Sequence, residues 1–262
     1  MIISFRYIEI SINRNPYRIQ LKFRRNPIWY RSDYKRFLSL IGNDGSFPIK
    51  DSMPCVDDKG QEAGFVRSHY FMQDLYVAQM IFKNNPSKHV DIGSRIDGFV
   101  AHVASFREVE LFDIRKMEST IPHVKYRQAD LTDEATIPHD YCDSISSLHA
   151  IEHFGLGRYG DKLDPEGHKK GFNNITQILK PGGTFYFSVP MGKQRIDFNA
   201  HRVFGMPYLL EWIKKDYDIV SFAYISDNGQ IHTEVNYTDS DISKSFDCNY
   251  GCAIFELKKK IK

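Results

Sequence analysis

Short apolar runs alternate with helix-length segments from about residue 66 to the end of the chain. Before the first run, apolar residues at positions 71, 75, 78 and 82 recur at helical spacing and Asn84-Asn85-Pro86 follows, which predicts a helix from Ser68 to Phe82. The apolar runs predict strands at 89–92, 109–113, 124–130, 143–148 and 184–189, and residues 172–180 predict a helix that ends in a turn at 181–183. Because strands that alternate with helices form a parallel sheet covered on both faces, we expect an α/β, Rossmann-like fold.

The last two predicted strands depart from this alternation. A helix is predicted from Pro207 to Lys215, followed by strands at 217–225 and 252–257, and no helix-length apolar pattern separates these strands. Two strands without a crossover helix are most simply antiparallel neighbours. The sheet is therefore expected to be mostly parallel, with a terminal antiparallel strand pair.

Residues 1–65 follow a different pattern and predict a separate basic extension, with 66–262 as the main domain. Apolar and polar residues alternate over 2–12 and 17–23, which predicts a β-hairpin, and the Gly-, Pro-, Asp- and Ser-rich residues 38–65 predict a linker. Residues 1–36 carry a charge of +7, so the remainder carries −5 of the total +2. These cations form either a solvated face of the hairpin or, with the interleaved aromatic residues, a surface for nucleic acid, an anionic membrane or an anionic glycan.

Composition excludes several classes of protein. At 262 residues with 42% hydrophobic content, the chain is long enough to bury a full core. It has no run of about 18 apolar residues, and its first residues lack the layout of a signal peptide. The four cysteines are scattered and form no Cys-x-x-Cys pair. We therefore expect a cytoplasmic protein with reduced thiols and no transmembrane segment.

The run ending at Gly93 has the pattern of a nucleoside-binding βαβ unit. Gly93 permits a tight turn, Gly98 permits close packing of the next helix, and Asp113, twenty residues after Gly93, is placed to accept hydrogen bonds from ribose hydroxyls. Arg95, however, occupies the second glycine position of a diphosphate-binding loop, and Asp97 adds a negative charge there. A dinucleotide is therefore disfavoured, whereas S-adenosylmethionine, which has no phosphate and carries an ammonium group, remains compatible.

Other polar residues are expected at the same edge of the sheet. Asp130 ends the third predicted strand, as Asp113 ends the second, and ligands of such sheets bind at the carboxyl ends of the strands. On the preceding helix, Tyr70, Gln73 and Asp74 are placed either to reach the amino-acid part of a cofactor or to serve as capping and surface residues.

Taken in order, these motifs resemble those of class I S-adenosylmethionine-dependent methyltransferases. The resemblance covers about residues 66–257 and rests on Asp91-x-Gly93, Asp113, Ala129-Asp130-Leu131, residues 147–153, Leu179-Lys180-Pro181-Gly182-Gly183 and Ser188-Val189-Pro190. More narrowly, residues 69–75, 155–161 and 199–204 resemble a poorly characterised methyltransferase-like family associated with surface-polysaccharide genes.

The resemblance implies a role for each matching position. It places Asp91 and Gly93 near the methionine part of the cofactor, Asp113 on the ribose, and Asp130 with Leu131 at the adenine. Gln73 is assigned to the cofactor as well, and Arg95 is a candidate partner of the cofactor carboxylate.

Methyl transfer to a hydroxyl group requires a base that removes the proton, and a histidine suits neutral pH. His149 follows the fourth predicted strand and is the first candidate, with Glu152 orienting it or holding the acceptor. His153 and His201 are the alternatives. Residues 149–153 also match His-x-x-Glu-His, a zinc-peptidase signature, but the preceding apolar run makes His149 a strand-end residue, so no metal site is predicted.

A glycine-rich segment from Gly155 to His168 predicts a mobile loop over the site or a plain surface loop. Within it, Arg158, Tyr159 and Asp161, together with Arg202 after the fifth strand, are candidates to hold a sugar or an anionic acceptor by hydrogen bonding and stacking.

The sequence thus predicts a methyltransferase that acts on oxygen of a sugar or sugar-derived small molecule. One alternative is a non-catalytic methyltransferase-like domain whose altered glycine loop binds no cofactor. A nucleic-acid methyltransferase that uses the basic extension and a nicotinamide-dependent oxidoreductase are less favoured. The sequence leaves the acceptor, the methylated atom and the oligomeric state open.

Overall fold

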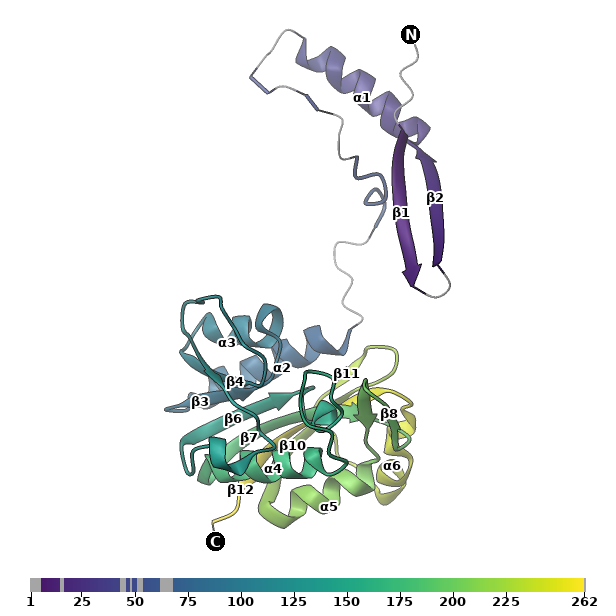
Figure 1. Cartoon of the computed structure of the whole chain (residues 1–262). Coiled ribbons are helices and arrows are strands. Elements are labelled where there is room, and N and C mark those ends of the chain that lie inside the picture. The colour runs from purple at the N-terminus through teal and green to yellow at the C-terminus, as the bar shows by residue number, and fades with distance from the viewer. Residues whose placement is uncertain are drawn as a thin grey trace. The chain divides into compact units, whose positions relative to one another are not determined.

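The computed structural model describes residues 6–14, 17–42, 46–47, 49–50, 54–61 and 68–261, and it describes side chains from Asn26 onward. The chain divides into two compact units, Met1–Phe65 and Val66–Lys262. Each unit is described by itself (Figure 1).

The first unit contains a two-stranded antiparallel sheet, β1 (Arg6–Arg14) and β2 (Tyr17–Arg25), followed by helix α1 (Ile28–Ile41). Parts of the predicted hairpin, residues 2–5 and 15–16, lie outside the described residues, as do the side chains of its cations. The prediction of a linker from residue 38 misses the end of α1, although apolar residues at 30, 34, 37, 38 and 41 recur at helical spacing.

The second unit is built on an eight-stranded sheet in the order β11-β10-β12-β7-β6-β3-β4-β5 (Figure 1). The strands from β7 to β5 are parallel, and β12 runs antiparallel to both β7 and β10. The strands are β3 (His89–Ile92), β4 (Val109–Asp113), β5 (Val124–Gln128), β6 (Cys142–Leu148), β7 (Leu179–Met191), β10 (Tyr217–Ile225), β11 (Ile231–His232) and β12 (Gly251–Lys259). This confirms the predicted fold, with the antiparallel pair formed by β10 and β12.

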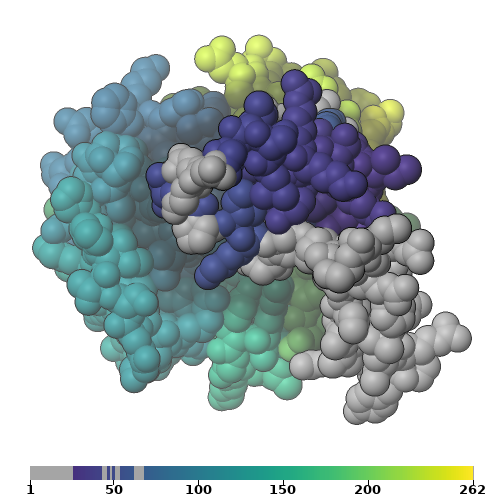
Figure 2. All heavy atoms as spheres, turned by 90° about the horizontal axis from the view of Figure 1, so that it is seen from above, coloured from purple at the N-terminus to yellow at the C-terminus, as the bar shows by residue number. Residues whose placement is uncertain are grey.

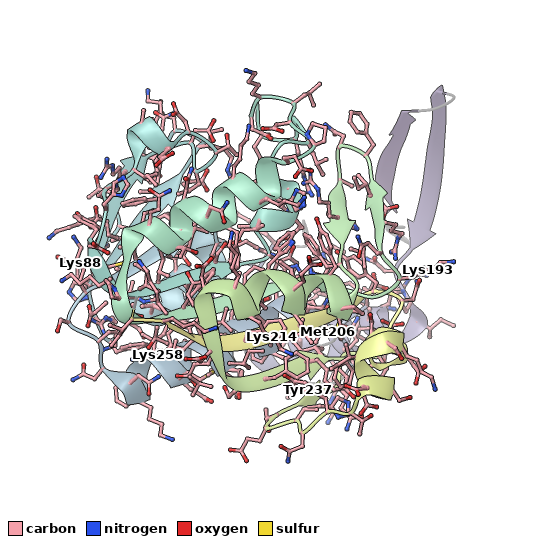
Figure 3. All side chains as sticks on the ribbon, turned by 90° about the horizontal axis from the view of Figure 1, so that it is seen from below. Lys88, Lys193, Met206, Lys214, Tyr237 and Lys258 are labelled. Atoms are coloured by element: carbon pink, nitrogen blue, oxygen red, sulfur yellow. The ribbon has the colours of Figure 1, made fainter. Side chains whose placement is uncertain are left out.

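Helices cover both faces of this sheet because its strand residues alternate between two apolar cores. Phe185 and Phe187 on β7 pack in one core with α4 (Gly167–Ile178) and α5 (Met206–Asp216), while Tyr186 packs in the other. The second core also contains residues of α2 (His69–Asn84), the π-helical turn η1 (Ile96–Val100) and α3 (Ala101–Ala104). Figure 3 shows α4 and α5 side by side across their face of the sheet, with Met206 and Lys214 on α5. In the space-filling view, the blue and teal segments that include α2 and α3 form the left side of this unit (Figure 2), and α2 also contacts β10 and β12.

The predicted turn at 181–183 is instead part of strand β7. Leu179 pairs with Cys142, and Thr184 pairs with Ser144, so residues 180–183 form a bulge in the ladder. Gly182 has φ +72°, a conformation that suits glycine in a bulge. Helix α4 therefore ends at Ile178, two residues earlier than predicted, and begins at Gly167 rather than Phe172.

Shorter elements connect the sheet and were not predicted from the sequence. They are η2 (Glu134–Thr136), η3 (Ile151–His153), β8 (Arg195–Asp197), β9 (His201–Val203), α6 (Asp239–Lys244) and η4 (Ser245–Asp247). β8 and β9 form an antiparallel ribbon, and η3 lies directly after β6, at the edge where ligands of parallel sheets bind.

Candidate functional site

A cavity of about 290 Å³ opens at the carboxyl ends of β3, β4 and β6. Its wall also includes the segment after β5 and residues of η3 and the following loop. From β3 the chain continues to β4 and β5 on one side of the sheet, and then returns to form β6 on the other side of β3. The cavity therefore lies next to β3, where the strand order reverses. Open α/β sheets bind their ligands at this position.

The turn after β3 is held by a buried aspartate. Asp91 is fully buried and accepts hydrogen bonds from the Ser94 backbone N–H (3.0 Å) and hydroxyl (2.8 Å) and from the Ser146 hydroxyl (2.6 Å). Burial raises the pKa of Asp91 to about 7. Gly93 has φ +68° and lines the cavity, and a Cβ there would lie 3.2 Å from the Ala150 Cβ. The Asp91 carboxylate fixes the turn and does not line the cavity, so its expected position near the methionine part of a cofactor stays a prediction.

Arg95 lies in the cavity wall where a dinucleotide-binding loop has its second glycine. Its guanidinium pairs with Asp97, with 2.9 Å between Nη2 and Oδ2, and lies 5.3 Å from the centre of the Tyr70 ring. Gly98 packs closely against α2, since a Cβ there would come within 2.6 Å of Asp74 Oδ2. A charged side chain thus stands where a diphosphate needs bare backbone, which disfavours a dinucleotide.

The acid at the end of β4 forms a salt bridge that the sequence analysis missed. Arg115 binds Asp113 through Nε (3.0 Å to Oδ1) and Nη2 (2.6 Å to Oδ2), and its backbone N–H donates to Oδ1 (2.8 Å). A carboxylate offers about four lone-pair positions, so Asp113 retains acceptor capacity for a ligand hydroxyl. Arg115 also lines the cavity. Its position two residues after a strand-end acid is the signal that would have identified it.

The segment after β5 supplies an apolar part of the wall. Leu131 is buried and lines the cavity together with Ile92 and Phe112. Asp130 also lines the cavity, but it accepts hydrogen bonds from the backbone N–H and the hydroxyl of Thr132, each at 2.8 Å, and so closes the turn of its own segment.

His149 follows β6 and is held beside an acid and a thiol. Its Nδ1 lies 2.9 Å from Glu152 Oε1, and the two side chains are 3% and 1% exposed. Burial by itself would lower the pKa of His149, but Cys252 and Glu152 outweigh burial and raise it to about 10. Burial would raise the pKa of Glu152, yet His149 lowers it. The pair is an imidazolium and a carboxylate at neutral pH, so His149, the first candidate for a general base, already carries the proton.

His153 lines the same cavity with a neutral ring. Its Nδ1 donates to the Ala200 carbonyl at 2.6 Å, which leaves the lone pair on Nε2, and burial lowers the pKa of His153. Its Nε2 lies 3.7 Å from Glu152 Oε1, close enough for the carboxylate to stabilise a proton taken up there. His201 lies off the cavity, with its Nε2 3.3 Å from Asp197 Oδ2.

The loop at 155–166 is organised by its own acid. Asp161 accepts hydrogen bonds from the backbone N–H groups of Gly155 (2.8 Å), Gly157 (3.1 Å) and Tyr159 (3.1 Å). Asp161 lines the cavity, but these three bonds commit its carboxylate to the loop backbone, so it fixes the conformation of the loop.

Besides Asp91, two further predicted ligand-binding residues do not line the cavity. Arg202 is 3% exposed and donates to three backbone carbonyls between Glu152 and Pro165, so it ties η3 to the following loop. Gln73 is 1% exposed and accepts a hydrogen bond from the Ser188 hydroxyl, which ties α2 to β7. These polar groups form hydrogen bonds inside the protein, so the structure does not bring them to the cavity with the other predicted residues.

The described part of the chain has no group of three or more His, Cys, Asp or Glu side chains that could hold a metal ion. His149 precedes η3 and His153 ends it, so the His-x-x-Glu-His segment does not present both rings from one helix. None of the described helices is long and apolar enough to cross a membrane.

The model of a family described as "Caenorhabditis protein of unknown function, DUF268" matches residues 102–251, more than half of the chain. The chain belongs to this family. No curated protein matches the sequence.

Solved structures share the fold of this DUF268 member at low sequence identity. The Burkholderia thailandensis 1,6-didemethyltoxoflavin-N1-methyltransferase, with 1,6-didemethyltoxoflavin and S-adenosylhomocysteine bound, is similar over 100% of this chain and 98% of its own, with 13% identity and a TM-score of 0.51. The cyclase SpnF is similar over 71% of this chain and 82% of its own, with 12% identity and a TM-score of 0.50. At such identities the similarity establishes the fold alone.

The cavity wall offers an adenosyl group an apolar surface and a hydrogen-bond acceptor. Five of the predicted cofactor-binding residues surround the cavity, namely Gly93, Arg95, Asp113, Asp130 and Leu131. They combine an apolar surface, an acid with spare acceptor capacity and a glycine turn that no Cβ obstructs. Of the predicted catalytic and acceptor-binding residues, His149, His153, Arg158, Tyr159 and Asp161 also line the cavity.

Proposed function

We propose that this DUF268 member is an S-adenosylmethionine-dependent methyltransferase that methylates a hydroxyl oxygen of a small molecule, with His153 as the general base. The observation that carries the proposal is a single cavity at the reversal of strand order. That cavity joins Gly93, Asp113 and Leu131, which suit an adenosyl group, to the neutral ring of His153.

The residues at β3, β4 and β5 would hold the cofactor. Asp113 accepts hydrogen bonds from the ribose hydroxyls, while Leu131 and Phe112 pack against the adenine. Arg95, at the cavity wall, pairs with the carboxylate of the methionine part, and Gly93 lets the backbone approach it.

Bound S-adenosylmethionine would supply an electrophilic methyl group on a sulfonium. His153 Nε2 would take the proton of the acceptor hydroxyl as that oxygen is methylated. Glu152, 3.7 Å from Nε2, stabilises the imidazolium that results. A positioned general base contributes typically about 10²–10⁴-fold to the rate.

A sugar or sugar-derived acceptor is proposed for two reasons. The sequence motifs resemble those of a family associated with surface-polysaccharide genes, and the cavity mouth carries Tyr159 and Arg158, whose ring and guanidinium suit stacking and hydrogen bonding to a hydroxyl-rich ligand.

The proposal is tested by isothermal titration of the purified protein with S-adenosylmethionine and S-adenosylhomocysteine, with NAD as the negative control. We expect both adenosyl ligands to bind, and Asp113→Ala to weaken binding at least about 10-fold, because the ribose loses its charged acceptor. Asp218→Ala is the matched control, since Asp218 is exposed on β10 and does not line the cavity. Absence of binding by both adenosyl ligands would overturn the proposal.

The second candidate is a methyltransferase-like domain without methyl transfer. Two observations favour it: the cyclase SpnF has a similar fold, and Arg95 with Asp97 departs from the glycine-rich loop. This candidate predicts that the chain binds neither adenosyl ligand, so the same titration separates the two functions.

A further inference from the structure

The guanidinium groups of two arginines pack against the ring of one tyrosine at the mouth of the cavity. The guanidinium carbons of Arg115 and Arg158 lie 4.7 Å and 5.2 Å from the centre of the Tyr159 ring, and all three residues line the cavity. Arg115 comes from the segment after β4, whereas Arg158 and Tyr159 come from the loop after η3, so the contact joins the cofactor side of the cavity to the acceptor side.

The two guanidinium groups differ in their partners. Arg115 is neutralised by the bidentate salt bridge to Asp113. For Arg158, no carboxylate within the described residues forms an ion pair, and Asp161, three residues along the loop, is bound to backbone N–H groups. Arg158 is therefore a cation in the cavity wall whose charge is matched by no carboxylate of the described residues.

A shared carbonyl places this cation beside the proposed base. Arg158 Nη1 donates to the Ala200 carbonyl at 2.9 Å, and His153 Nδ1 donates to the same oxygen at 2.6 Å. Nη1 also lies 3.4 Å from His153 Nδ1, so the donors of Arg158 that are available to a ligand are those on Nε and Nη2. The Ala200 carbonyl thus holds the side chains of His153 and Arg158 next to each other.

We propose that Arg158 binds an anionic group of the methyl acceptor, a carboxylate or a phosphate, next to the hydroxyl whose proton His153 removes. This inference rests on the proposed function and names the chemical class of its acceptor. Planar guanidinium groups bind such oxygens in a bidentate way, and Tyr159 limits the orientations that the guanidinium adopts. The acceptor is then an acidic or phosphorylated sugar rather than a neutral one.

The test uses protein saturated with S-adenosylhomocysteine and four probes: inorganic phosphate, glucose 6-phosphate, glucuronate and glucose. We expect the three anions to bind at least about 10-fold more tightly than glucose, and Arg158→Gln to abolish this preference, because a hydrogen bond to a charged group is lost. Arg158→Lys should retain part of the preference for anions over glucose. Lys162→Gln, an equal charge change at an exposed position of the same loop, should leave it unchanged.

The other outcomes are distinguishable. If S-adenosylhomocysteine itself fails to bind, the proposed function fails before the acceptor is considered. If it binds but the loaded protein shows no preference for anions, or if Arg158→Gln retains the preference, the acceptor inference is overturned while the methyltransferase proposal stands. If the anions displace S-adenosylhomocysteine, the acceptor inference is also overturned, because the anions then bind in the cofactor site and not beside it.

Discussion

Replacing Glu152 by glutamine tests the buried ion pair beside the cavity. Glu152 is 1% exposed, with Oε1 2.9 Å from His149 Nδ1 and 3.7 Å from His153 Nε2, and its Oε2 has no hydrogen-bond partner among the described residues. The substitution removes the charge that stabilises the His149 imidazolium. Removing one partner of a buried pair costs about 3–5 kcal/mol, and His149 reduces this cost only by releasing its proton.

The loss of stability should depend on pH. His149 has a pKa of about 10 in the folded protein, above the ordinary value of 6.5 that applies to the unfolded chain. Such a group stabilises the fold fully below pH 6.5, and this contribution is lost toward pH 10 by about 1.4 kcal/mol for each pH unit. In Glu152→Gln, one of the two groups that raise the pKa of His149 is removed, so this pKa falls and the loss of stability toward pH 10 becomes smaller. The difference in unfolding free energy between wild type and variant should therefore be largest near pH 6 and small near pH 9.

Urea unfolding of both proteins at about pH 6, 7.5 and 9 measures this difference. Glu211→Gln serves as the control, because Glu211 is exposed on α5 and should change the unfolding free energy little at any pH. A destabilisation by Glu152→Gln that is equal at all three pH values would refute the reasoning, since it would mean that His149 is neutral in the folded protein.

Two further substitutions test the base and the packing below the loop. His153→Gln should lower the methyl-transfer rate about 10²–10⁴-fold, remove the rise in rate with pH through the His153 pKa below 6.5, and leave S-adenosylhomocysteine affinity unchanged, as measured by labelled-methyl transfer and titration. His201→Gln, off the cavity, is its control, and an equal loss in both variants would count against a specific base. Gly171→Ala places a Cβ 2.3 Å from the Phe154 ring and should cost about 1–3 kcal/mol in urea unfolding. An unchanged midpoint would show that the Phe154 ring moves aside freely.

The fold was largely predictable because its signals are local. Apolar runs of strand length and the helical spacing at 71, 75, 78 and 82 identify the strands and α2, and the missing crossover helix before β12 identifies the antiparallel pair. The sequence predicts a turn at 181–183, where the structure has a bulge of β7. Pro-Gly-Gly has the same local backbone preferences in a turn and in a bulge. Only the pairing of Leu179 with Cys142 extends the strand through it.

The candidate site was predictable in position but not in the use of each side chain. Strand ends fall at one edge of a parallel sheet, so Gly93, Asp113 and Asp130 could be placed around a cavity from sequence alone. Asp91 has the same sequence signal, but in the structure its carboxylate is enclosed by hydroxyl groups from elsewhere in the chain. A sequence gives residue types at strand ends and cannot give the partners that fold against them.

The histidines show this division most clearly. The sequence by itself determined that His149 and His153 follow a buried strand at the ligand-binding edge, because strand length and alternation are local properties. Only the tertiary structure decided which of them is neutral. Cys252, more than a hundred residues away, and Glu152 raise the pKa of His149, while the Ala200 carbonyl fixes the His153 proton on Nδ1 and burial lowers its pKa. Proton affinity depends on the charges and dipoles packed around a ring, and in a folded chain these come from distant segments.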